Sequence, residues 1–420
     1  MLFRLAIWLC LAAATARSAP PIPLEEYRQR RQALRNALPD GLILLEGAGE
    51  SETGDLRTGF LQEPNFYYLT GWREPGALLI LNPSAEYFFL PPRNEKRERY
   101  TGRKAAPGDP NLESITGFSG VESSEQWREK LRELAQRTPK LFLLPEEALK
   151  KVVREVAPNA EQNDLTLPLA RLLMVKSERE IALLQESADA TVGAHLAAWR
   201  RLKPGIFEYQ LAAAMAGFYL DRGCERHAYP AIVASGPKAL ILHYGENKRR
   251  IDRGELALMD VGAECSGYAA DLTRTVPAAG KFTPRQRELY EVLLGAQSAA
   301  IASAKPGMML RGSAENSLEQ LVKNYLDKHG KGPNGDPLSK YFTHGLGHHV
   351  GLQVHDAADP SLPLAAGMVV TIEPGLYIPE ENIGLRIEDM VLITGNGARL
   401  MSASLPREVR EIERFFARTN

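Results

Sequence analysis

The segment LALMDVGAECSGYAADLTRT, residues 256–275, contains two apolar stretches with one aspartate in each. We read it as a hairpin of two buried strands joined by a tight turn. A turn centred between Cys265 and Ser266 places Asp260 directly opposite Asp271, on the same face of the hairpin. A glycine bulge would shift this register by one residue.

A second segment, residues 368–393, has the same design. We read it as one strand, a turn at residues 379–382 and a returning strand. This register places Glu373 opposite Glu388. Each hairpin is therefore predicted to present a facing pair of carboxylates.

Facing carboxylates inside apolar strands need a compensating positive charge, because like charges directly opposite destabilise a sheet and a buried unpaired carboxylate is costly. The pairs could share protons, receive lysine or arginine side chains, or bind metal ions. A single acid would more simply be an exposed hairpin residue. Two matched pairs favour metal, since four carboxylates around two dications are close to neutral.

The two hairpins follow matching helix signals. These are a cap before an apolar helix, a Lys-Pro-Gly stop and a second helix that contains Tyr-Leu-Asp at its end. In this order they occur at Ser177 with Glu180, residues 203–205 and residues 219–221, and again at Thr283 with Pro284 and Gln286, residues 305–307 and residues 325–327. We infer that residues 177–405 are two related halves of one pseudo-symmetric domain, because the period is too long for a solenoid.

The rest of the chain divides into a leader and a smaller domain. A basic start and a short apolar run predict a signal peptide over residues 1–16, with cleavage as late as residue 19. A first domain is expected over residues 22–165 and the domain with the hairpins over residues 170–415. Apolar runs predict buried strands in the first domain at residues 41–45, 76–81 and 141–145.

Composition limits the partners of the chain. Lys and Arg number 51 against 52 Asp and Glu, a formal net charge of −1, so no basic excess indicates a nucleic-acid partner. After leader removal no stretch predicts a membrane span, and we expect an exported protein, periplasmic or extracellular. Only Cys224 and Cys265 would remain, too few for a disulfide framework, so the fold must rest on an ordinary core.

Several histidines cluster near the second hairpin. A glycine-rich segment of twelve residues contains four histidines, His344, His348, His349 and His355. His243 lies in the first half of the domain. Structural roles are assigned to His195, on a helix face, and to His329, at a helix end. The role of His227 is left open.

The motifs together resemble the M24 metallopeptidases, the group of aminopeptidase P, prolidase and methionine aminopeptidase. The early run FYYLTGWREPGALLIL resembles the N-terminal domain of aminopeptidase P and prolidase. The motifs that carry the resemblance are LALMDVGAECSGYAADLTRT, HGLGHHVGLQVHD at residues 344–356, TIEPGLY at 371–377, GLRIEDM at 384–390, ASGPKALILHYGEN at 234–247 and FYYLTGWREPGALLIL at 66–81.

This resemblance implies an α/β (α+β) architecture: a pita-bread catalytic domain preceded by a smaller creatinase-like α/β domain. It adds His348 to the four acids as a fifth metal ligand and places His344 in a supporting position. It also implies that His243, His355 and Arg386 line the substrate site. His349 departs from the family pattern, and strand alternation predicts that it points away from the metals.

The expected activity is that of a dinuclear-metal aminopeptidase that hydrolyses the N-terminal Xaa-Pro bond. The metals are expected to be Mn²⁺ by resemblance, with Co²⁺ or Zn²⁺ also compatible with oxygen and nitrogen ligands. We expect a metal-bridging hydroxide to attack the scissile carbonyl, with Glu373 moving the proton, His243 polarising the carbonyl and His355 orienting the substrate. The alternatives are a Xaa-Pro dipeptidase (prolidase) and, more remotely, a non-catalytic peptide-binding protein.

Substrates are expected to be peptides with proline in second position. We also expect a homo-oligomer, a dimer or a tetramer.

Overall fold

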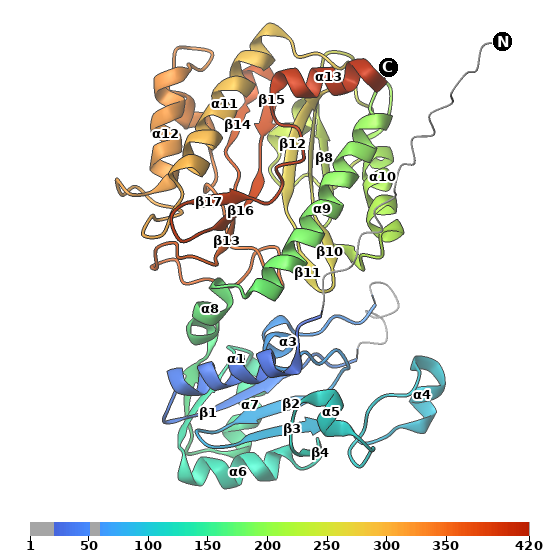
Figure 1. Cartoon of the computed structure of the whole chain (residues 1–420), viewed down its shortest axis with the longest axis vertical. Coiled ribbons are helices and arrows are strands. Elements are labelled where there is room, and N and C mark those ends of the chain that lie inside the picture. The colour runs from blue at the N-terminus through green and yellow to red at the C-terminus, as the bar shows by residue number, and fades with distance from the viewer. Residues whose placement is uncertain (1–20, 51–58, 420) are drawn as a thin grey trace, which may run out of the picture.

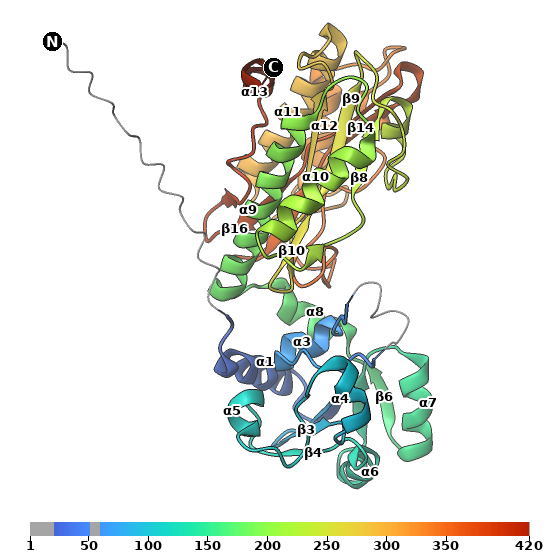
Figure 2. The same cartoon turned by 90° about the vertical axis from the view of Figure 1, so that its right-hand side faces the viewer.

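The chain forms two lobes joined by α8 (Thr166–Met174), as a computed structural model shows for residues 21–50 and 59–419 (Figures 1 and 2). The signal peptide predicted over residues 1–16, with cleavage as late as residue 19, lies outside these described residues. Within them, every helix is too short or too polar to cross a bilayer.

The N-terminal lobe is built on a six-stranded mixed sheet of order β4-β3-β2-β1-β5-β6. The strands predicted from apolar runs are the adjacent β2, β1 and β5. Strands covered on both faces read as unbroken apolar runs, whereas the edge strands β4 and β6 are short and polar and gave no such signal. The strands are β1 (Gly41–Glu46), β2 (Leu78–Leu81), β3 (Glu86–Leu90), β4 (Val121–Ser123), β5 (Lys140–Leu143) and β6 (Glu161–Asp164).

Helices pack around this sheet and complete the lobe. In Figure 1, α1 and α3 lie on the side of the sheet that faces the C-terminal lobe, and α6 lies on the far side. These helices are α1 (Leu24–Ala37), α3 (Pro64–Thr70), α4 (Glu95–Thr101), α5 (Leu112–Thr116), α6 (Trp127–Arg137) and α7 (Glu147–Val156).

The C-terminal lobe begins each half with a pair of packed helices, as the repeated signals predicted. Ser177 caps α9 (Glu178–Arg201) in a capping box with Glu180, and Thr283 caps α11 (Pro284–Ser303) in the same way. Each first helix stops just before its Lys-Pro-Gly sequence. Each then packs against a second helix, α10 (Glu208–Asp221) or α12 (Leu318–His329).

Short antiparallel sheets lie between the two helix pairs (Figure 1). Strands of the first half form the orders β12-β9-β8 and β11-β10-β7, and those of the second half form β13-β16-β17 and β14-β15. The elements are β7 (Arg226–His227), β8 (Ile232–Ser235), η1 (Gly236–Leu240), β9 (Leu256–Val261), β10 (Ala263–Cys265), β11 (Tyr268–Ala269), β12 (Leu272–Pro277), η2 (Leu338–Tyr341), β13 (Val369–Ile372), β14 (Gly375–Ile378), η3 (Pro379–Glu381), β15 (Ile383–Arg386), β16 (Asp389–Ile393), β17 (Ala398–Leu400) and α13 (Val409–Thr419).

The register predicted for the first hairpin is wrong by two residues. Its turn is Ser266–Gly267, with φ of 56° and 82°, and not the Cys265–Ser266 step. Asp260 therefore pairs with Thr273 and not with Asp271. A shift of two residues keeps every side chain on its face, so both aspartates still reach the same site.

The register predicted for the second hairpin is confirmed, but its strands are not continuous. Gly375 pairs with Arg386 and Ile372 with Asp389, in one register on both sides of a break. The break removes Glu373 and Glu388 from the ladder. Glu388 instead forms a bridge with Thr273 of the first half, and so connects the two halves.

Cys224 and Cys265 form a disulfide between the end of α10 and the first hairpin. The sequence excluded a disulfide framework but did not predict this single bond. Next to it, Arg73 of the N-terminal lobe donates to the Ser266 carbonyl at 2.9 Å. The turn of the first hairpin is thus tied both to α10 and to the other lobe.

Candidate metal centre

The five predicted metal ligands lie at strand ends or breaks and line one cavity of about 800 Å³. Strand ends free side chains from the regular alternation of a sheet and let ligands from both halves converge. Asp260 lies near the end of β9, Asp271 between β11 and β12, His348 before β13, Glu373 between β13 and β14, and Glu388 between β15 and β16.

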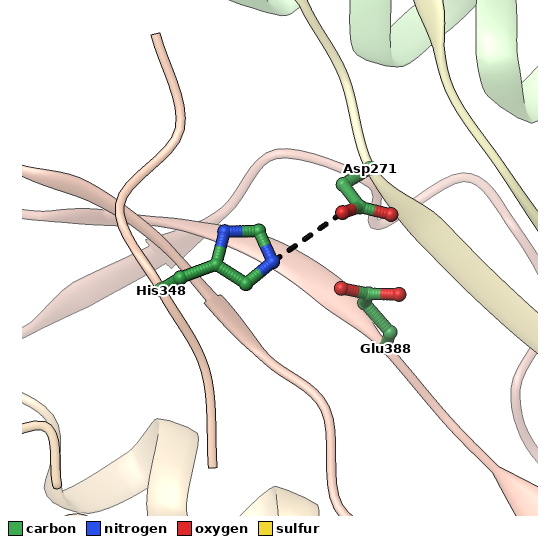
Figure 3. A group of neighbouring side chains, drawn as sticks. All are labelled: Asp271, His348 and Glu388. Carbon is green, nitrogen blue, oxygen red and sulfur yellow. Dashed lines mark ion pairs between the residues drawn. The ribbon is translucent and has the colours of Figure 1, made fainter. Parts of the chain in front are cut away.

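Asp271, His348 and Glu388 form the tightest group (Figure 3). One ligand atom from each lies within 4.8 Å of the others. His348 Nε2 lies 3.4 Å from Asp271 Oδ2 and also 3.4 Å from Glu373 Oε1. Imidazole and carboxylate groups therefore converge on one point, as metal coordination requires.

The hydrogen bonding of His348 prepares its Nε2 for a cation. Its Nδ1 lies 3.1 Å from the His349 carbonyl, which can only accept, so Nδ1 carries the proton in the neutral ring. The lone pair is then on Nε2, on the side of the acids. Fixing the tautomer through the second ring nitrogen is how proteins orient metal-binding histidines.

The acids are too crowded to be ionised together without a cation. Burial raises the pKa of Asp271, with Asp260 adding to the effect. Burial likewise raises the pKa of Glu373 to about 7 and that of Glu388 well above its usual range. Arg386 forms an ion pair with Asp260, whereas none of the described lysine or arginine side chains forms one with the other three acids.

One carboxylate oxygen is left without any partner. Thr273 Oγ1 donates to Glu388 Oε2 at 2.6 Å, whereas the buried Glu388 Oε1 has no hydrogen-bond partner among the described residues. An orphaned buried oxygen beside a histidine lone pair and raised carboxyl pKa values fits a divalent cation. Four carboxylates and one imidazole suit Mn²⁺, Co²⁺ or Zn²⁺.

His243 and His355 lie at the open part of the same cavity, where both side chains are exposed. The His355 ring packs edge-on against His348, with centroids 4.2 Å apart. Partial desolvation by the cavity wall lowers the pKa of His355, and the neighbouring His348 and His243 lower it further. Both rings can therefore meet a ligand that enters from solvent.

Arg386 lines the cavity, but its guanidinium is buried and engaged. It pairs with Asp260 and donates to the Tyr377 hydroxyl at 2.6 Å. Tyr377 lies 3.0 Å from His344 Nε2, and His344 Nδ1 contacts the Gly345 carbonyl at 2.9 Å. Since that carbonyl fixes the His344 tautomer, Tyr377 donates to Nε2. The chain from His344 to Arg386 thus holds Asp260 in place.

The remaining histidines lie away from the cavity. His349 is buried, does not line the cavity and has its pKa lowered to about 3 by burial. His195 bonds to the Leu272 carbonyl, and His329 to the Tyr325 carbonyl at the end of α12. His227 stacks edge-on against Tyr219.

Four further residues belong to the site although the sequence did not single them out. The Tyr229 hydroxyl donates between Asp260 Oδ1, at 2.5 Å, and Asp271 Oδ1. Thr371 Oγ1 donates to Glu373, Thr273 donates to Glu388, and Arg311 lines the cavity and donates to the Gly347 carbonyl. The threonines lie two residues from a ligand on the same strand face, a usable signal, whereas Tyr229 meets the aspartates only through the fold.

The fold and the site together define a two-lobed protein whose pseudo-symmetric lobe holds divalent metal. The sequence model of metallopeptidase family M24 matches residues 182–395, and that of the aminopeptidase P N-terminal domain matches residues 27–142. The chain belongs to metallopeptidase family M24.

Its relatives are more specific. The chain is 33% identical to the Xaa-Pro aminopeptidase of Haemophilus influenzae, over 93% of this chain and 97% of that protein. It is 32% identical to mouse Xaa-Pro aminopeptidase 3, over 96% and 87%. Zinc-substituted Escherichia coli aminopeptidase P with bound product superposes with a TM-score of 0.86 at 30% identity, over 96% of this chain and all of that one.

Proposed function

We propose that this chain is a Xaa-Pro aminopeptidase that uses two divalent metal ions. The convergence of four carboxylates and one imidazole in a single cavity carries this proposal. Relatives named Xaa-Pro aminopeptidase align with nearly the whole chain and support the substrate class.

The proposed ligands are Asp260, Asp271, His348, Glu373 and Glu388. When bound, two dications polarise the scissile carbonyl and lower the pKa of water towards neutrality. We propose Mn²⁺ as the native metal, with Co²⁺ or Zn²⁺ as the alternatives that metal analysis of the purified protein would distinguish.

The chain's own residues would bind the peptide and move protons around it. Glu373, whose partly buried carboxyl lines the cavity, would accept a proton during attack and return it to the leaving proline nitrogen. The exposed His243 and His355 would donate hydrogen bonds to the substrate and to the oxyanion. Arg386 would hold Asp260 in place, since its guanidinium is already paired with that carboxylate.

A second cavity favours longer peptides over dipeptides. It has a volume of about 530 Å³, lies between the lobes and shares Val354 and His355 with the metal cavity. The substrate of an aminopeptidase continues beyond the proline, and this second cavity gives that part of the peptide room to bind. The dipeptidase activity of a prolidase would not need it.

Two assays test the proposal. Asp260→Ala and Glu388→Ala should each lose bound metal and Xaa-Pro cleavage together, and full activity in either would rule out the metal mechanism. An Ala-Pro-Ala peptide should be cleaved far faster than Ala-Pro. Cleavage of the dipeptide alone would establish a prolidase, and tight binding of both peptides without cleavage would establish a binding protein.

We further propose that the protein is exported and that it works as a homo-oligomer, a dimer or a tetramer. The Cys224–Cys265 disulfide supports export, because disulfides persist in oxidising compartments. Cell fractionation tests the periplasmic or extracellular location. Light scattering of the purified protein tests the oligomer, and a monomer at working concentration would contradict it.

A further inference from the structure

The loop between η1 and β9 presents His243 to the metal cavity, although its own residues form neither helix nor strand around that position. His243 is exposed, whereas the next residue, Tyr244, is 3% exposed. The Tyr244 ring lies in a small core with Ile232, Ala234 and Leu258 of β8 and β9. The position of His243 therefore depends on what holds Tyr244.

A buried carboxylate holds Tyr244. Glu208, the first residue of α10, is completely buried and accepts the Tyr244 hydroxyl at 3.0 Å. The same carboxylate accepts Ser235 Oγ at 2.7 Å and the Arg249 backbone N–H at 2.9 Å. Glu208 thus contacts three positions: Ser235 at the end of β8, Tyr244 next to His243, and Arg249 at the far end of the loop.

Glu208 forms no ion pair with the described residues, and the Arg249 guanidinium pairs with Glu255 instead. Burying a carboxylate without a countercharge costs several kcal/mol unless hydrogen bonds compensate. Three donors and the N-terminus of α10 provide that compensation. Apolar packing alone could hold the Tyr244 ring without burying a carboxylate. The additional hydrogen bonds to Glu208 indicate that the loop is held in one conformation.

Two further contacts hold the loop on either side. Asn247, at φ 51°, accepts the Val233 N–H at 2.8 Å and donates to the Ala231 carbonyl at 2.8 Å. On the other side, the Leu242 carbonyl lies 3.5 Å from Arg386 Nη2. His243 is thus the exposed residue between two restrained neighbours, Leu242 and Tyr244.

We propose that Glu208 is a positioning residue that acts through Tyr244 to aim His243 at the substrate. This inference rests on the proposed function of His243 and extends it to a carboxylate outside the metal cavity. Glu208 itself touches neither substrate nor metal in this account. Its effect on the reaction should therefore disappear when His243 is absent.

Tyr244→Phe tests this with the smallest change, because it removes the hydroxyl and keeps the buried ring. Misplacing a group that contacts the substrate can cost up to about 100-fold in rate, so we expect a small displacement of His243 to lower kcat/KM on Ala-Pro-Ala roughly 10-fold. Bound metal should stay at the wild-type level, whereas Tm should fall modestly, because the buried Glu208 carboxylate loses one of its three donors. Tyr219→Phe is the matched control, since the Tyr219 hydroxyl is buried without a hydrogen-bond partner among the described residues and should be dispensable.

A double-mutant cycle separates positioning from general stability. In the His243→Ala background, Tyr244→Phe should cause no further loss, and Glu208→Gln should behave in the same way. Wild-type activity in Tyr244→Phe, or a full additional loss in the His243→Ala background, would overturn the proposal while leaving the aminopeptidase function intact. Full activity in His243→Ala would overturn the role of His243 and the positioning proposal with it.

Discussion

Thr273 shows how one hydroxyl prepares a ligand for a cation. It donates to one oxygen of Glu388 and accepts from Arg386 Nε at 3.3 Å, which orients both side chains. With that hydrogen bond on Glu388 Oε2, the other oxygen, Oε1, is buried without a hydrogen-bond partner among the described residues and faces the space a metal would occupy. Outer contacts of this kind fix the direction of a ligand as well as its basicity.

Thr273→Val should therefore weaken metal binding without unfolding the protein. The change keeps the shape of a fully buried residue and removes only the hydroxyl. We expect the apparent Kd for Mn²⁺ to rise roughly 10- to 100-fold, as for other losses of outer contacts to ligands. Calorimetric titration measures this, and Thr273→Ser should restore most of the affinity. Wild-type affinity in Thr273→Val would show that Glu388 needs no support.

His195 illustrates a titratable residue with a structural role. Its ring is fully buried between α9 and β12, Nε2 bonds to the Leu272 carbonyl at 3.1 Å, and Nδ1 has no partner among the described residues. Burial lowers the pKa of His195 to about 3 from an ordinary value of 6.5, and Arg274 contributes. The folded state thus keeps His195 neutral where the unfolded chain would protonate it.

Stability should fall as pH drops through the window between these two pKa values. Between pH 6.5 and pH 3 the unfolded chain binds a proton at His195 and the folded protein does not. The contribution of the neutral His195 to the free energy of unfolding is therefore complete above pH 6.5 and is lost as the pH falls towards 3. We expect His195→Gln to reduce the loss of unfolding free energy between pH 6.5 and 4.5 by about 2 kcal/mol. Urea unfolding at both pH values measures this, and equal losses in variant and wild type would contradict it.

The helices of the C-terminal lobe could be predicted from sequence more fully than its strands. A capping box is a local sequence pattern, so the boxes at Ser177 and Thr283 predict the start of their helices independently of the rest of the chain. The turn of the first hairpin is less determined, because Ser266–Gly267 competes with the neighbouring Cys265–Ser266 step. Its two positive φ values follow the type I′ pattern, which favours glycine and asparagine, and serine is a weak signal for it.

The same limit applies to the site. The register of the second hairpin could be derived because its turn, residues 379–382, begins with proline and ends with asparagine, two residues typical of turns. The strand breaks at the glutamates could not, since they depend on a bridge to Thr273 in the other half. The four acids of the candidate site could thus be found from local pattern and charge, whereas the Tyr229 hydroxyl that joins two of them required the fold.

The Cys224–Cys265 disulfide should stabilise the hairpin that carries the two aspartates. It closes a loop with a sequence separation of 41 residues and attaches β10 to the end of α10. The chain-entropy model gives about 4 kcal/mol for a loop of this length, and measured effects are about 2–4 kcal/mol. We expect the Cys224→Ala, Cys265→Ala double variant to lose stability in this range by urea unfolding.

Thiol counting provides the control for that variant. Unreduced protein should show no reactive thiol at Cys224 or Cys265, and reduction of the wild type should reproduce the stability of the double variant. Two free thiols in protein purified from an oxidising compartment would contradict the bond. Equal stability of variant and wild type would show that the bond adds nothing to the hairpin.

At the scale of the whole molecule, the candidate metal centre lies at the interface between the two halves of the C-terminal lobe. Asp260 and Asp271 come from the first half, and His348, Glu373 and Glu388 come from the second. Protein contacts already link the halves at this point, among them the bridge from Thr273 to Glu388 and the buried Arg274–Asp389 ion pair, but they leave the carboxylates close together. Cations would offset the crowding that raises the pKa values of Asp271, Glu373 and Glu388, and so would stabilise the halves against each other.

Removal of metal should therefore destabilise the folded protein as well as inactivate it. A ligand that binds only the folded state adds about 2.7 kcal/mol at a concentration 100 times its Kd, so EDTA treatment should lower Tm by several degrees and added Mn²⁺ should restore it. Glu388→Gln should lose most of this response, because the neutral amide cannot replace the negative charge of the carboxylate. In contrast, Glu122→Gln, on an edge strand of the N-terminal lobe, should respond to EDTA and Mn²⁺ as the wild type does. An unchanged Tm on chelation of a protein shown to contain metal would mean that the two halves hold together without it.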